Sequence, residues 1–115
     1  MTTPTPTPIT IEILYFDGCP SHEQLVEHLP RLLEREGITA NIVLRDIPDI
    51  ESALAERFLG SPTVRIDGRD IEAGAAKRDD YGLKCRIYKT EAGLVGLPAD
   101  KWILDVITAD RGAPE

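Results

Sequence analysis

A strand, a helix and a second strand follow one another in the first half of the chain, and this order constrains the fold most. Apolar side chains alternate from Ile9 to Phe16, which predicts a strand. Leucines then recur every three or four residues, which predicts a helix from about Pro20 to Glu36. Residues 39–46 predict a second strand. Because the connection is long, the two strands are expected to pair in parallel.

The segment after the second strand predicts a short helix and a hairpin. The helix begins at about Asp49 and ends at Gly60, and its expected buried stripe is Ile50, Leu54 and Phe58. The Asp67-Gly68 pair then predicts a tight turn between two antiparallel strands, residues 61–66 and 69–72.

The last third of the chain is less regular. Residues 74–81 predict a charged loop and residues 85–90 an extra short strand. A last helix is expected over residues 98–108, with Trp102, Ile103, Val106 and Ile107 facing inward. The whole chain thus predicts an α/β domain with the order β-α-β-α-β-β-α.

The length of 115 residues fits one domain. The expected organisation is a disordered Thr/Pro arm over residues 1–8, a folded domain over residues 9–110 and a flexible tail over residues 111–115. A net charge of −7 argues against binding to nucleic acid or to an anionic membrane surface. The chain shows no secretory signal and no apolar run of about 20 residues, so a cytoplasmic location is expected.

Cys19 is the candidate reactive residue because it lies where the first strand turns into the first helix. A helix N-terminus stabilises a thiolate, so the pKa of this thiol is expected to fall below about 8.5. His22 lies near the same helix face and favours the thiolate when protonated, while Asp17 and Glu23 oppose it. Gly18 and Pro20 are expected to build an exposed turn around the thiol. The alternative is that Cys19 is a small buried apolar residue.

Two segments carry a resemblance to a known family. They are Phe16-Asp17-Gly18-Cys19-Pro20-Ser21-His22 at the strand-to-helix turn and Gly60-Ser61-Pro62-Thr63-Val64 before the hairpin. In this order they resemble the thioredoxin and glutaredoxin superfamily over about residues 9–72. The resemblance implies a thioredoxin-like fold with a mixed four-stranded sheet and helices on both faces. It also implies that Pro62 is a cis proline opposite Cys19.

The same resemblance implies a substrate site. The backbone at Ser61, beside Pro62, is expected to receive an extended thiol substrate, and Gly18 and Pro20 are the other expected substrate-binding residues. The expected activity is thiol-disulfide exchange in which the Cys19 thiolate attacks a disulfide. The partners implied are small thiols or disulfide-containing proteins, and no nucleotide, flavin or haem site is apparent.

The motif departs from the family at its fourth position, where His22 replaces the second cysteine. Without that cysteine the motif cannot complete dithiol exchange by itself. Cys19 is therefore expected to act as a monothiol nucleophile whose mixed disulfide is resolved by Cys85 or by an external thiol such as glutathione. Whether Cys85 reaches Cys19 across 66 residues is left open by the sequence, and burial of Cys85 among Tyr81, Ile87 and Tyr88 is the alternative.

Two further functions stay open. Cys19, His22 and Cys85 have the ligand types that soft metal ions prefer. The spacing also has a weak similarity to organomercurial (alkylmercury) lyase, although His22 stands where a carboxylate is expected and only Asp17 is a near acid. The third possibility is a thioredoxin-fold binding module without chemistry, for which a buried or unreactive Cys19 is sufficient.

Overall fold

The structure is a computed structural model that describes residues 9–110. The predicted arm, residues 1–8, and the predicted tail, residues 111–115, lie outside the described residues. The element order confirms the predicted alternation of strands and helices and adds a short second hairpin before the last helix.

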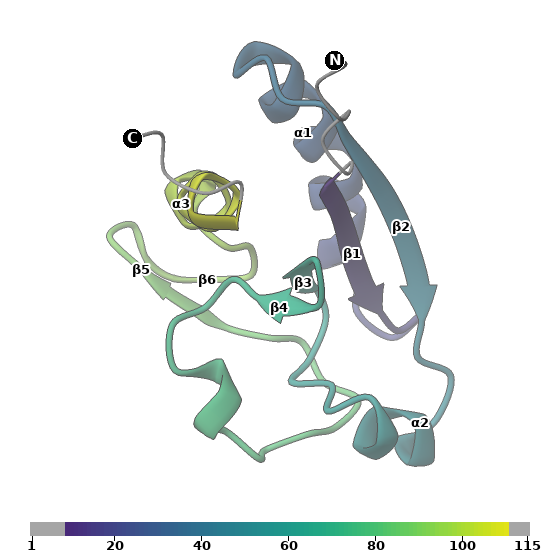
Figure 1. The fold of residues 1–115 in the computed structure, drawn as a ribbon. Coiled ribbons are helices and arrows are strands. Elements are labelled where there is room, and N and C mark those ends of the chain that lie inside the picture. Colours follow the sequence, from purple (N-terminus) through teal and green to yellow (C-terminus); the bar gives the residue numbers. More distant parts are fainter. Residues whose placement is uncertain (1–8, 111–115) are drawn as a thin grey trace.

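Four strands form a mixed sheet in the order β2-β1-β3-β4 (Figure 1). β1, Ile9–Tyr15, pairs in parallel with β2, Ala40–Asp46, as the long connection predicts. β3, Thr63–Ile66, is antiparallel to β1 and to β4, Arg69–Asp70. The predicted Asp67-Gly68 turn joins β3 to β4, and both of its residues have positive φ. A mixed four-stranded sheet is therefore confirmed.

Within residues 9–110, three α-helices and a second hairpin accompany this sheet. α1 spans Ser21–Arg35, α2 spans Ile50–Ala55 and α3 spans Asp100–Asp110. The predicted extra strand is β5, Tyr88–Thr90, which pairs with β6, Gly93–Val95, in a separate two-stranded sheet. The predicted charged loop contains a single short 3-10 helix, Ala75–Lys77. Within residues 9–110, the structure contains no helix that could span a lipid bilayer.

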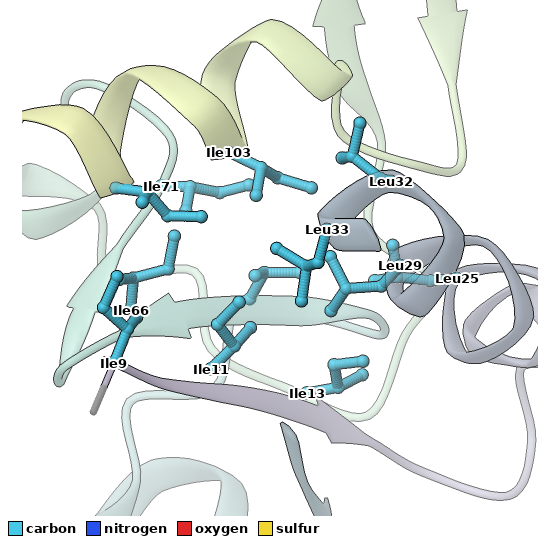
Figure 2. Close-up of a cluster of buried hydrophobic side chains, with 12 residues drawn as sticks. Ile9, Ile11, Ile13, Leu25, Leu29, Leu32, Leu33, Ile66, Ile71 and Ile103 are labelled. Carbon is cyan, nitrogen blue, oxygen red and sulfur yellow. The ribbon is translucent and has the colours of Figure 1, made fainter. Parts of the chain in front are cut away.

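The main core lies between one face of the sheet and two helices (Figure 2). β1 and β3 contribute isoleucines and a valine, α1 contributes four leucines, and α3 contributes two isoleucines. The sheet and helix positions at the centre of this core are fully buried, namely Ile11, Ile13, Leu25, Leu29, Val64, Ile66 and Ile103. The helical spacing of the leucines in α1 thus presents one continuous apolar face to the sheet.

The opposite face of the sheet carries a smaller core, and here one prediction is wrong. Leu14 points away from the main core and packs with Ala53 of α2 and with Phe58. The predicted buried stripe of this helix included Ile50 and Leu54, but these side chains are 51% and 56% exposed. α2 has only six residues and packs through Ala53, so the rest of its surface stays in solvent.

Candidate functional site

Cys19 lies in the connection from β1 to α1, as predicted, and its backbone N–H donates to the carbonyl of Phe16 at 3.2 Å. Gly18 and Pro20, on either side, are exposed. Cys19 itself is fully buried, with 0% of its surface accessible. The expectation of an exposed thiol in this turn is therefore wrong, because other parts of the chain cover the residue.

Cys85 is the partner of Cys19. The two residues form a disulfide with their Cα atoms 5.6 Å apart. Cys85 therefore reaches Cys19 despite the separation of 66 residues. It provides the second sulfur that the motif lacks because His22 occupies the fourth position. Cys85 is exposed, so the alternative of a packed core cysteine is wrong.

The segment around Cys85 pairs with the residue before Pro62. The Ser61–Pro62 peptide bond is cis, as the resemblance implies. Ser61 and Cys85 form an isolated parallel β-bridge. The Ser61 N–H donates to the Lys84 carbonyl at 2.8 Å, and the Arg86 N–H donates to the Ser61 carbonyl at 2.9 Å. The backbone groups expected to receive a substrate are thus occupied by residues 84–86 of the same chain.

Arg86 is the strongest anchor of this segment, and no pattern in the sequence predicted its burial. Its guanidinium donates to both carboxylate oxygens of Asp70, at 2.8 and 3.0 Å. It also donates to Glu72 at 2.7 Å and to the hydroxyl of Thr63 at 3.2 Å. The guanidinium lies 4.6 Å from the centre of the Tyr88 ring. A buried arginine with these partners ties the segment to β3 and β4.

The ionisation of this cluster follows from its burial and its charges. Burial alone lowers the pKa of Arg86, but the hydrogen bond and charge of Asp70, together with Glu72, raise the pKa overall. Arg86 therefore stays charged. Burial raises the pKa of Tyr88 well above its ordinary value. The neutral Tyr88 hydroxyl donates to the Pro62 carbonyl, which fixes the segment a second time beside the cis peptide.

His22 contacts the main chain of Cys19, and its predicted effect on a Cys19 thiolate stays a prediction. Its Nδ1 lies 2.9 Å from the carbonyl oxygen of Cys19, and because a carbonyl only accepts, Nδ1 donates. Its ring stacks on Tyr15 with the centroids 4.2 Å apart. This proton is therefore given to the main chain of Cys19 and not to its sulfur.

Two oxygen atoms lie near the sulfur of Cys19. The Ser21 hydroxyl and the Ser61 carbonyl oxygen are each 3.6 Å from Sγ. Within residues 9–110, the buried Ser61 hydroxyl has no hydrogen-bond partner. The same part of the chain holds no group of three or more His, Cys, Asp or Glu side chains arranged to bind a metal ion. The site is thus a pair of sulfurs between a helix N-terminus and a cis proline.

An open hollow of about 1020 Å³ adjoins the Arg86 cluster. Asp70 and Glu72 line it from one side and Trp102 from α3 lines it from another. Its lining includes neither Cys19 nor Cys85, so the disulfide lies outside this hollow.

Comparisons with protein-family models, with curated proteins and with solved structures found no match for this chain.

Proposed function

We propose that the protein has a thioredoxin-like fold and acts as a thiol-disulfide oxidoreductase whose redox pair is Cys19 and Cys85. The observation that carries this proposal is the disulfide itself, which joins the strand-to-helix turn to a segment paired with the residue before a cis proline. The internal partner makes a complete dithiol cycle available, so a monothiol mechanism is not required.

The cycle balances in two exchange steps. In the reduced protein one cysteine thiolate attacks a substrate disulfide, forms a mixed disulfide and releases the first substrate thiolate. The second cysteine thiolate then attacks the protein sulfur of that mixed disulfide and releases the second substrate thiolate. The substrate gains two electrons and the Cys19–Cys85 disulfide forms. Two external thiols, such as two molecules of glutathione, return the protein to its reduced form and become a disulfide themselves.

The first test is the reduction potential of the wild-type protein. The protein is equilibrated in buffers with graded ratios of thiol to disulfide, quenched and scored by mass for free thiols. A potential above about −300 mV supports an exchanging pair, whereas a structural disulfide has a potential below that value. The lower result would overturn the proposal and favour a binding module with a fixed disulfide.

Turnover gives an independent readout. Wild-type protein is expected to accelerate the reduction of bis(2-hydroxyethyl) disulfide by glutathione. The variant with both Cys19→Ser and Cys85→Ser retains the serine hydroxyls but no sulfur, so its rate is expected to equal that of buffer. Activity in that double variant would show that the chemistry occurs elsewhere, provided that its circular dichroism matches the wild type.

Binding of a soft metal ion is a second function that one observation favours, since the two sulfurs are bonded to each other and so lie close together. On reduction, two neighbouring thiolates can hold an ion such as Hg(II). The reduced wild-type protein is expected to bind one Hg(II) per chain in a titration followed by thiolate-to-metal absorption. Equal binding by the Cys85→Ser variant would exclude a two-sulfur site.

A further inference from the structure

The sequence suggests that Cys19 meets the substrate, but the segment of residues 84–86 covers it. Cys19 is fully buried beneath this segment, and both backbone hydrogen-bonding groups of Ser61 are taken by Lys84 and Arg86. An external disulfide therefore has no access to Cys19 while the segment stays in place. The exposed member of the pair is Cys85.

The segment is held by more than the disulfide. Arg86 is only 1% exposed and is bound by Asp70, Glu72 and Thr63. Gly60 makes the close approach possible, because a Cβ atom on this residue would lie 3.0 Å from both the Lys84 carbonyl oxygen and the Arg86 nitrogen. These contacts do not involve the sulfurs, so they are available in the reduced protein as well.

Thiol-disulfide exchange requires that the attacking sulfur reach its target in line with the bond that breaks. In the oxidised protein, a substrate thiolate can approach only an accessible cysteine. In the reduced protein, the accessible thiolate is the one that meets a substrate disulfide. In both directions Cys85 is the cysteine that meets the substrate, because Cys19 is buried and Cys85 is exposed.

Resting on the proposed oxidoreductase function, we propose that Cys85 is the catalytic nucleophile and that Cys19 is the resolving cysteine. The Cys85 thiolate attacks the substrate disulfide and expels one substrate thiolate, so that the substrate is attached to Cys85 Sγ. The Cys19 thiolate then attacks Cys85 Sγ and expels the second substrate thiolate. In the reverse direction, a thiolate attacks Cys85 Sγ and Cys19 leaves as a thiolate.

Two features beside Cys19 favour a thiolate as the leaving group, whereas burial and the Ser61 carbonyl oxygen at 3.6 Å disfavour it. Cys19 lies two residues before α1, a helix of 15 residues, whose N-terminal dipole favours a negative charge there. The Ser21 hydroxyl, 3.6 Å from Sγ, can donate to the thiolate. A stabilised thiolate is a faster leaving group in disulfide exchange. The two cysteines therefore have different roles. Cys85 is accessible to the substrate, and Cys19 is the leaving group whose negative charge is stabilised.

The test is competitive labelling of the reduced wild-type protein. A short pulse of N-ethylmaleimide, at less than one equivalent, is quenched with excess thiol, and the label on each cysteine is measured by peptide mass spectrometry. Because accessible cysteines react and buried ones do not, Cys85 is expected to carry at least about ten times more label than Cys19. In guanidinium chloride the two cysteines are expected to react equally, which provides the control.

Equal labelling in the native protein, or faster labelling of Cys19, would overturn the assignment. Either result would mean that residues 84–86 leave Ser61 on reduction and open the site to substrate at Cys19. The reduction potential separates this failure from a failure of the proposed function. A potential above about −300 mV with Cys19 labelled first rejects only the order of attack, whereas a potential below that value rejects the exchange reaction itself.

Trapping the intermediate gives a second readout. The Cys19→Ser variant lacks the resolving sulfur, so oxidised glutathione is expected to accumulate as a stable mixed disulfide on Cys85. The matched Cys85→Ser variant leaves only the buried thiol and is expected to react at least about tenfold more slowly. A faster reaction of the Cys85→Ser variant, with wild-type circular dichroism, would contradict the assignment.

Discussion

Arg86 and Ile87 occupy environments opposite to those that their side chains suggest. Arg86 is 1% exposed and Ile87 is 55% exposed. In extended backbone, neighbouring side chains point to opposite sides, so only one of the two can face the protein interior. The pairing of Cys85 with Ser61 and the bond from Tyr88 to Pro62 turn Arg86 inward. Side-chain hydrophobicity alone therefore predicts the wrong solvent exposure for Arg86 and Ile87.

Replacing Arg86 with methionine is expected to destabilise the protein by about 3–5 kcal/mol, because Asp70 loses its buried cationic partner and Glu72 keeps only Arg78. Urea unfolding of the oxidised protein at pH 7 measures this loss. Arg31→Met is the matched control, since Arg31 pairs with Glu27 on the surface and its loss is expected to cost less than about 0.5 kcal/mol. Equal costs for the two variants would show that the Arg86 cluster adds no stability.

At the scale of elements, α1 and α2 show how length changes the meaning of an apolar pattern. α1 has 15 residues, and its leucines repeat often enough to cover a sheet face. α2 has six residues and is fixed by the Asp49 side chain, which accepts from the Ser52 N–H, and by packing of Ala53. Its remaining apolar residues match a helical repeat but face solvent.

A pair of leucine substitutions tests this difference between the helices. Leu29→Ala in α1 removes a fully buried side chain and is expected to cost about 2–5 kcal/mol in the free energy of unfolding. Leu54→Ala in α2 removes a side chain that is 56% exposed and is expected to change stability by less than about 0.5 kcal/mol. Urea denaturation of both variants is the measurement. A large loss for Leu54→Ala would mean that α2 packs through the predicted stripe after all.

At the scale of the whole molecule, the disulfide joins the first part of the sheet to the last third of the chain. It connects the turn after β1 to the segment before β5 and closes a loop of 66 residues. The main core already holds β1, β3, α1 and α3 together without the disulfide. The fold is therefore expected to persist when the two cysteines are reduced.

Reduction is nevertheless expected to lower the free energy of unfolding. Closing a loop of this length restricts the unfolded chain, which contributes about 4 kcal/mol in the chain-entropy account. Urea unfolding with and without a phosphine reductant measures the difference. The variant with both cysteines replaced by serine serves as the control, because the reductant is expected to leave its stability unchanged. Identical unfolding of the oxidised and reduced wild-type protein would contradict a disulfide that constrains the chain.

Most of the helices and strands were predictable from local sequence patterns. Period-two and helical repeats depend on local backbone geometry, so they predicted β1, α1, β2, the β3–β4 hairpin and α3 with bounds close to those observed. The position of Cys19 before α1 was predictable for the same reason.

The residues of the site come together through contacts between parts of the chain that are distant in sequence. A repeat tells which side chains share a face but not whether another element covers that face, so the exposure of Ile50 and Leu54 was not predictable. The pairing of Cys85 with Cys19 depends on how the last third of the chain returns to Ser61. That return also buries Cys19 and Arg86 and leaves Cys85 exposed. Contacts between residues distant in sequence have no local periodicity, and they decide which sulfur meets solvent.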